Sequence, residues 1–251
     1  MRTGFLQPDW PAPPRVRAAV ATRAAPGVSV APFGPCNLGA RSGDDPAAVA
    51  ANRAALADAL ALPSAPLWLR QVHGTRVVDA DAAAPGGEPQ ADAALTRTPG
   101  RVLAILTADC LPLLFARDDG GAVAAAHAGW RGLSAGVLEA TLGALAAPPA
   151  RVLAWLGPAI GAASYEVGEE VRAAFVDADP GAAIAFAPTR PGHWHCDLEA
   201  LARRRLAAAG VTRVHGGGFD TRADPRFHSY RRDGARSGRF ASLVWIAQNA
   251  S

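Results

Sequence analysis

Short apolar runs recur along the chain and end at clusters of Gly, Pro and Asp, which is the pattern of β-strands bounded by turns. Val, Ile, Leu and Ala dominate these runs, so the strands are expected to be largely buried. Two runs flank Asp118-Asp119-Gly120-Gly121, which predicts a hairpin. The pattern predicts strands over residues 67–74, 75–80, 101–107, 111–116, 122–128, 151–157 and 239–248.

Longer segments with apolar residues at helical spacing lie between the strands. Residues 47–62 follow Asp44-Asp45-Pro46, which supplies an N-cap and a first-turn proline. A helix over residues 133–147 is expected to stop at a Pro-Pro pair, and one over residues 197–210 to begin with a cap at Asp197. Residues 164–180 are expected to form an ordinary amphipathic helix rather than an exposed recognition helix.

Neighbouring strands are joined by short turns, and helices are interspersed among them. We therefore expect a mixed α/β or α+β fold in which helices cover the β-sheets. The Pro- and Gly-rich stretches are short and are typical of loops, so residues 1–251 are expected to form a single domain. A chain of this length can bury a substantial core.

The composition excludes several classes of function. All 25 basic residues are arginine, the net charge is only +3, and the arginines are scattered, so nucleic-acid binding is not expected. No apolar run is long enough to span a membrane, and the first residues lack the apolar stretch of a signal peptide. We therefore expect a cytoplasmic protein. Its three cysteines argue against a disulfide framework and leave reactive or metal-binding thiols open.

The segment from Thr107 to Gly132 places a thiol and an imidazole among apolar residues. Cys110 lies at the break between two predicted strands, where Pro112 disfavours regular pairing, so its side chain can point into a cleft. The alternative is a small buried hydrophobic residue, which is what free cysteine usually is. His127 ends the next strand, before a Gly-rich turn and a helix, a junction that suits a functional site. The alternative is that His127 is a hydrogen-bonded core histidine.

His73, beside a glycine at a strand end, is a third candidate. Two histidines and one cysteine can bind zinc and leave the fourth position open, as in catalytic zinc sites. None of the three lies in a local motif such as CxxC or HExxH, so their spacing alone does not establish a site.

Seven segments run in order from Cys36 to Arg239: "CNLGARSGDDPAAVAANR", "WLRQVHGTRVV", "ADAALTRTPG", "TADCLPLL", "AAAHAGWRGLSAG", "GPAIGAASYEVGEEV" and "FHSYRRDGARSGR". Through these segments the chain resembles the bacterial multifunctional purine nucleoside phosphorylases, which are also described as laccase-domain or polyphenol-oxidase-like proteins. The combination of ADC and HAGWRG is highly specific for this family.

The resemblance implies a zinc ion held by the histidine of QxHG, the cysteine of ADC and the histidine of HAGWRG. These positions are His73, Cys110 and His127. It implies phosphorolysis of adenosine, inosine and S-methyl-5′-thioadenosine, together with hydrolytic deamination of adenosine. Purine nucleosides and phosphate are then the expected partners, and the protein is expected to be a monomer or a homodimer.

Further roles follow from combining the resemblance with the chemistry of the residues. Asp109 can orient a metal ligand or act as a base, and so joins the three ligands as a catalytic candidate. Arg131 and the helix start after Gly132 can hold phosphate. Further candidates for binding substrate or phosphate come from the CNLG…NR segment, namely Arg41, Arg53 and Asn37. Trp130 and Tyr230 can stack on a purine or serve as packing anchors.

The chain departs from the family in two places. It has "GAASYEV" where members often carry cysteines, and Asp220-Thr221 where members often carry Cys-Thr. Neither position is one of the three metal ligands, so the departures bear on additional thiol or second-metal chemistry and not on the zinc assignment.

Three other functions stay open at this point. Cys110 can be the nucleophile and His127 the base of a Cys-His hydrolase or deamidase, in a fold related to the toxin-deamidase-like Cys-His fold. A copper-dependent polyphenol oxidase is less favoured, because six histidines are too few for two His-rich copper centres. The "HWHC" stretch, which includes His193, His195 and Cys196, is expected to be a loop leading into a helix. A metal-binding or partner-binding domain is the non-enzymatic possibility.

Overall fold

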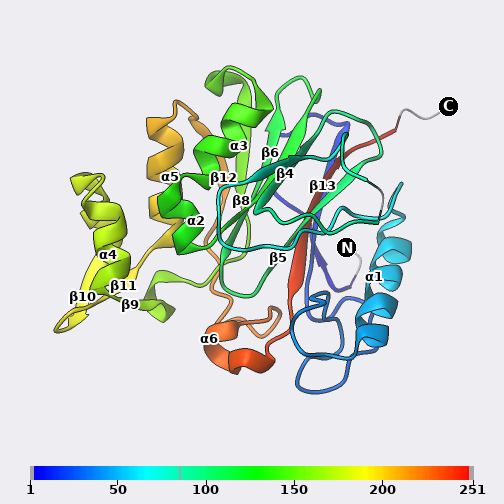
Figure 1. Cartoon of the computed structure of the whole chain (residues 1–251), viewed down its shortest axis with the longest axis horizontal. Helices are drawn as coiled ribbons and strands as arrows, with labels where there is room; N and C mark the ends of the chain where they lie inside the picture. The colour runs from blue at the N-terminus through cyan, green and yellow to red at the C-terminus, as the bar shows by residue number, and fades with distance from the viewer. Residues whose placement is uncertain (1–2, 85, 249–251) are drawn as a thin grey trace.

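The computed structural model describes residues 3–84 and 86–248, and its α+β fold contains three β-sheets (Figure 1). In chain order the strands are β1 (Phe5–Leu6), β2 (Val16–Ala21), β3 (Val77–Asp79), β4 (Ala93–Thr96), β5 (Val102–Thr107), β6 (Leu111–Arg117), β7 (Val123–Ala128), β8 (Val152–Leu156), β9 (Glu166–Gly168), β10 (Phe186–Arg190), β11 (His193–Cys196), β12 (Arg213–Gly216) and β13 (Phe240–Ile246). The sheets have the orders β1-β2-β13-β5, β12-β8-β6-β7-β4-β3 and β10-β11-β9.

Helices lie outside the two larger sheets. They are α1 (Pro46–Leu60), α2 (Trp130–Ala135), α3 (Val137–Leu145), α4 (Glu169–Val176), α5 (Leu198–Ala208) and α6 (Tyr230–Asp233), with short 3₁₀ turns at Pro149–Arg151, Ala162–Ser164, Pro180–Ala185 and Gly234–Arg236. Within the described ranges, no helix combines the length and apolar character needed to cross a membrane.

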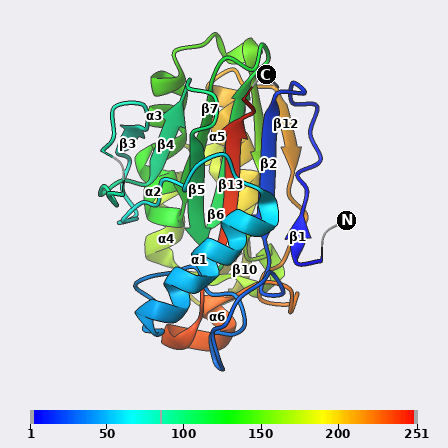
Figure 2. The ribbon, with the colours of Figure 1, turned by 90° about the vertical axis from the view of Figure 1, so that its right-hand side faces the viewer.

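The four-stranded and six-stranded sheets pack face to face. Ile105 of β5 and Val244 of β13 share a buried cluster with Leu114 of β6 and Ala125 of β7. On the outer face of the four-stranded sheet, α1 packs through Leu56 (Figure 2). Helices α2, α3 and α5 cover the outer face of the six-stranded sheet. The layers therefore run helix, sheet, sheet, helix, and the small third sheet with α4 lies at one side (Figure 1).

The capping residues place the helix ends largely where the sequence predicts them. Asp45 accepts a hydrogen bond from the Ala47 N–H, and Pro46 occupies the first turn of α1. Asp197 caps α5 in the same way through the Ala200 N–H. The strand predictions for β5, β6, β7, β8 and β13 are confirmed apart from small shifts at their ends.

Other element predictions are wrong, for identifiable reasons. Residues 67–74 form no strand and make only isolated bridges at Leu67 and Arg70, and the strand predicted at 75–80 shrinks to β3. The helix predicted over 133–147 is broken into α2 and α3, because Gly136 adopts the left-handed φ of 103°.

The predictions for the segments of the third sheet are also wrong. Residues 164–180 begin with strand β9, and only Glu169–Val176 are α-helical. The HWHC stretch is not a loop but β11, which pairs with β10 on one side and β9 on the other. Its aromatic and imidazole side chains suit a pleated, half-buried surface.

Candidate functional site

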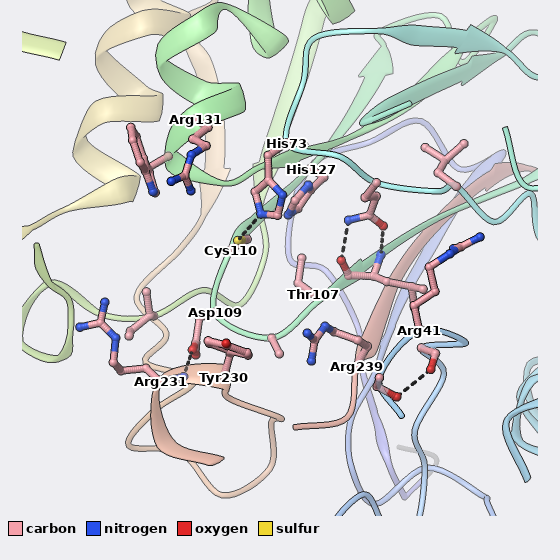
Figure 3. A pocket seen from close by; sticks show the side chains of 18 of the residues that line it. Arg41, His73, Thr107, Asp109, Cys110, His127, Arg131, Tyr230, Arg231 and Arg239 are labelled. Carbon is pink, nitrogen blue, oxygen red and sulfur yellow. Dashed lines mark hydrogen bonds between the residues drawn. The ribbon is translucent and has the colours of Figure 1, made fainter. Parts of the chain in front are cut away.

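A cavity of about 580 Å³ opens where the two packed sheets meet. The six-stranded sheet contributes Cys110, just before β6, and His127 in β7. The four-stranded sheet contributes Thr107 at the end of β5 and Arg239 just before β13. His73 reaches the same space from the loop before β3 (Figure 3). Strand ends from both sheets therefore converge on one site.

The structure brings His73, Cys110 and His127 together. Their ligand atoms all lie within 4.8 Å of one another, and Cys110 Sγ is 3.8 Å from His73 Nε2. His127 is buried, Cys110 is half-buried and His73 is exposed. His73 adopts a left-handed φ of 62°, which turns its imidazole out of the chain path toward the thiol.

These residues fit a metal ion. Bond lengths of about 2.0–2.1 Å to nitrogen and 2.3 Å to sulfur set tetrahedral ligands about 3.6 Å apart, close to the observed S–N distance. Gly129 leaves the space free, since a Cβ there would lie 2.7 Å from His73 Cδ2 and 3.0 Å from Cys110 Sγ. The donor set of two imidazoles and one thiolate is one that zinc and copper both accept.

Asp92 holds two of the three ligands and was missed by the sequence analysis. It is fully buried, and its Oδ1 lies 2.8 Å from His127 Nδ1. The same carboxylate accepts the backbone N–H groups of Val72, His73 and Gly74. Its bond to His127 leaves Nε2 of that ring free for a metal, as carboxylate–histidine–metal arrangements require.

The cluster favours a charged thiolate–imidazolium pair when no metal is bound. Burial opposes ionisation of Cys110, but the neighbouring His127 and His73 outweigh it and lower the thiol pKa to about 6. Burial likewise opposes protonation of His127, whereas Cys110 and Asp92 raise its pKa to about 9. A thiolate is the form that binds metal and the form that attacks carbon.

The cavity lining is strongly basic. Four arginines line it, namely Arg41, Arg131, Arg231 and Arg239, while Asp109 is the only acidic residue among the lining residues. Arg131 is exposed and stacks on Trp130, with 4.3 Å from its guanidinium carbon to the ring centroid. The cavity therefore combines a possible metal centre with an excess of positive charge.

A family model described as multi-copper polyphenol oxidoreductase laccase matches residues 17–247. The chain belongs to this family.

Curated relatives of this laccase family member carry the name purine nucleoside phosphorylase. One from Xylella fastidiosa (strain 9a5c) is 55% identical over 251 residues and covers 96% of each chain. One from Pseudomonas aeruginosa is 56% identical over 244 residues, covering 96% of this chain and 98% of the relative. The Escherichia coli K12 relative, purine nucleoside phosphorylase YfiH, is 48% identical over 96% of this chain and 98% of its own.

Two solved structures share the fold. A Neisseria meningitidis protein described as DUF152 superposes with a TM-score of 0.93 at 47% identity, covering 98% of this chain and 100% of that one. YlmD from Geobacillus stearothermophilus gives a TM-score of 0.91 at 29% identity, covering 99% and 98% of the two chains.

The remaining candidates from the sequence occupy different positions in this laccase-family fold. Asp109 directly precedes Cys110 and lines the cavity, and its carboxylate oxygens accept the Thr221 hydroxyl and the Arg231 N–H, both at 2.6 Å, rather than a hydrogen bond from a ligand side chain. Arg53 and Asn37 lie outside the cavity lining: Arg53 pairs with Glu88, and Asn37 is fully buried.

Arg41 lines the cavity while paired with Glu88 at 2.9 Å. The helix start expected after Gly132 is wrong, because α2 begins at Trp130 and Gly132 lies inside this six-residue helix. Trp130 and Tyr230 both line the cavity.

The histidines of the HWHC stretch lie apart from the three ligands. His193 lines a neighbouring depression of about 400 Å³, and Cys196 is fully buried in the core. Within the part of the chain that the structure describes, His73, Cys110 and His127 are the only group of His, Cys, Asp or Glu whose ligand atoms cluster in this way.

Proposed function

We propose that this protein is a zinc-dependent purine nucleoside phosphorylase that also deaminates adenosine. The observation that supports this most directly is a His-Cys-His cluster facing an arginine-lined cavity of about 580 Å³. That volume lies within the range of about 300–1,000 Å³ typical of small-molecule sites. The names of the curated relatives supply the reaction class.

In the phosphorolysis, an oxygen of phosphate forms a bond to C1′ of the ribose as the C1′–N9 bond breaks. The electron pair leaves with the purine, which is protonated, so that the products are the free base and ribose 1-phosphate. The arginines of the cavity would hold the phosphate and offset its charge, and Arg131 and Arg41 are the two that the sequence analysis named. Trp130 and Tyr230 offer flat surfaces to the purine.

The chain's own residues would arrange the metal side of the site. His73, Cys110 and His127 would hold zinc, and Asp92 would fix the His127 ring. A bound zinc supplies Lewis acidity for both reactions. In the deamination, water adds to C6 of the adenine and ammonia leaves, giving inosine. S-methyl-5′-thioadenosine differs from adenosine only in its 5′ group, so the chemistry at C1′ is the same for both.

The test is product analysis of zinc-loaded, copper-loaded and metal-free protein with adenosine, with and without phosphate, beside a Cys110→Ala control. We expect adenine only when phosphate is present, inosine without it, and neither in the control. Zinc-loaded wild-type protein that forms neither product would overturn the proposal. Oxidation of a phenol by the copper-loaded protein alone would favour a polyphenol oxidase instead.

A second function is favoured by one specific observation. In space, the Asp92 carboxylate bonds the His127 imidazole, which lies beside the Cys110 thiol. These are the positions of an orienting acid, a base and a nucleophile, and the thiol pKa is lowered to about 6. This is the arrangement of a Cys-His hydrolase or deamidase. Alkylation by iodoacetamide separates the two functions: zinc should protect Cys110 in a zinc enzyme, whereas a thiol hydrolase should be inactivated by the reagent and inhibited by zinc.

A further inference from the structure

We propose that Arg239 and Thr107 form the phosphate seat of this cavity, and that Asn37 and Gly39 hold Arg239 in place for it. This inference rests on the proposed phosphorylase function and deepens it, since it assigns the anion to one corner of the site. The sequence analysis had considered Arg131, Arg41, Arg53 and Asn37 for this role, and neither Arg239 nor Thr107.

Arg239 differs from the other three arginines of the cavity in being half-buried, whereas Arg41, Arg131 and Arg231 are exposed. Arg41 is paired with Glu88, Arg131 is exposed on Trp130, and Arg231 donates to the Glu166 carbonyl and lies over the Tyr165 ring. Arg239 is half-buried, and none of the ion pairs among the described residues includes it. A desolvated cation without a counter-ion is costly, and a bound anion removes that cost.

The guanidinium is aimed by its own backbone. One terminal nitrogen of Arg239, Nη1, donates to the carbonyls of Ser237 at 2.7 Å and Gly238 at 2.9 Å. Its remaining guanidinium N–H groups donate to no other residue in ranges 3–84 and 86–248, so they are available to an anion. Figure 3 shows the guanidinium directed from the start of β13 toward the space between Thr107 and Tyr230.

Thr107 supplies a second donor beside it. Thr107 pairs with Phe240 across β5 and β13. Because Arg239 directly precedes Phe240, the two neighbouring strands bring Thr107 and Arg239 to the same end of the sheet. Thr107 is only 2% exposed and lines the cavity, and among the described residues its buried hydroxyl has no hydrogen-bond partner. A buried hydroxyl without a partner is uncommon and calls for one from a ligand.

The loop before α1 is built to fit Arg239. Asn37 Oδ1 accepts the backbone N–H of Arg239 and that of Gly39, each at 2.9 Å. The Leu38 N–H donates to the Arg239 carbonyl at 2.9 Å. A Cβ on Gly39 would lie 2.7 Å from Arg239 Cγ, so only glycine lets the arginine stem lie there without a shift. Asn37 is thus a positioning residue.

The ligand chemistry is a tetrahedral oxyanion with several acceptor oxygens. A guanidinium and a hydroxyl together match phosphate better than they match a neutral sugar hydroxyl. The phosphate can be free or can belong to a nucleotide. Inorganic phosphate and adenosine 5′-monophosphate are therefore compared as separate probes.

The experiment is calorimetric titration of the zinc-loaded protein with inorganic phosphate, beside steady-state KM for phosphate at saturating inosine. Arg239→Gln should weaken phosphate binding at least tenfold, and Arg239→Lys should recover part of it. Thr107→Val should weaken it about threefold to tenfold, as the loss of one neutral hydrogen bond does, while Thr107→Ser should stay near the wild type. Arg131→Gln, the matched exposed arginine, should change it less than Arg239→Gln.

Several outcomes would overturn the proposal. A folded Arg239→Gln protein with wild-type phosphate affinity would do so, and so would a larger effect of Arg131→Gln. If Arg239→Gln fails to fold, unchanged phosphate affinity in Thr107→Val decides against the seat. Wild-type protein that binds adenosine 5′-monophosphate but not inorganic phosphate would replace free phosphate by a nucleotide. Formation of base and ribose 1-phosphate by the wild type is scored separately, so the phosphorylase function can stand when the seat does not.

Discussion

The two halves of the proposed site, one for the metal and one for the anion, are assembled in different ways. The metal half consists of His73, Cys110 and His127 with Asp92, and most of it belongs to one sheet: Asp92 and His127 precede or occupy the neighbouring strands β4 and β7. The anion half consists of Thr107, Arg239 and Asn37, and depends on contacts between segments that are 202 residues apart. Strand pairing aligns residues in both halves, but Arg239 is also tied by side-chain hydrogen bonds to a loop that is far away in the sequence.

This difference suggests how each half should respond to mutation. Changes in the metal half should alter metal affinity with little effect on phosphate, and changes in the anion half should do the reverse. Asp92 accepts the backbone N–H of His73, and Asn37 accepts the backbone N–H of Arg239. Each therefore positions a site residue in its own half.

The largest effect is expected for Cys110→Ser. The thiolate is the only soft, charged ligand of the cluster, so zinc affinity should fall by more than the roughly 10–100-fold that is typical of losing an outer support. Competition with a chromophoric chelator measures it. Phosphate affinity should change little, and wild-type zinc affinity in the variant would rule out Cys110 as a ligand.

Asp92→Asn should come next. The amide keeps the size of the carboxylate but cannot accept a hydrogen bond from every group that Asp92 serves, and it weakens the hold on the His127 tautomer. Zinc affinity should fall about 10–100-fold. Asp220→Asn is the matched control, since the Asp220 carboxylate accepts hydrogen bonds from Gly161 and Ser164 instead of a ligand and its replacement should leave zinc affinity unchanged. Equal losses in both variants would contradict the positioning role of Asp92.

Asn37→Ala tests the support of the anion half. Asn37 also donates to the Ser42 hydroxyl at 2.7 Å and to Asp44 at 2.9 Å, so its loss leaves buried groups unpaired and should cost about 2–4 kcal/mol of stability. Phosphate KM should rise while zinc affinity stays the same. Asn52→Ala, at a buried amide of α1 that donates to the Ser29 hydroxyl and the Asn37 carbonyl, should destabilise the fold with a smaller change in phosphate KM. Urea unfolding and steady-state kinetics measure the two effects.

The smallest effect concerns the pH dependence of stability. His228 Nε2–H donates to the Cys36 carbonyl at 2.9 Å, and burial lowers its pKa to about 4 from 6.5. The unfolded chain therefore binds more protons below pH 6.5, so this stability is fully present above about pH 6.5 and is lost as the pH falls toward 4. The loss between pH 7 and pH 5 should be about 2 kcal/mol.

Urea unfolding of wild-type protein and His228→Gln at the two pH values checks this expectation. The variant should lose less stability on acidification, because its side chain does not titrate. Parallel losses in the two proteins would show that carboxylates, not His228, set the acid sensitivity.

The sequence analysis found the metal half more completely than the anion half, for physical reasons. Cys110 and His127 stand out because polar, reactive side chains at the ends of apolar strands are unusual. Asp92 was missed because it directly precedes β4, a short, Ala-rich strand that the hydrophobic pattern did not predict. Arg239 is one of 25 arginines, and its burial depends on a distant loop that no local pattern reveals. The relation to toxin deamidases stays a prediction.

The central position of β13 in its sheet also sets the order in which the site can form during protein synthesis. Strand β13 lies between β2 and β5 and pairs with both, so neither of those strands has its full set of hydrogen bonds before residues 240–246 have emerged from the ribosome. The six-stranded sheet, with Cys110 and His127, needs none of these residues for its own pairing. A nascent chain can therefore bring the thiol and imidazole together before Arg239 reaches its place beside Thr107.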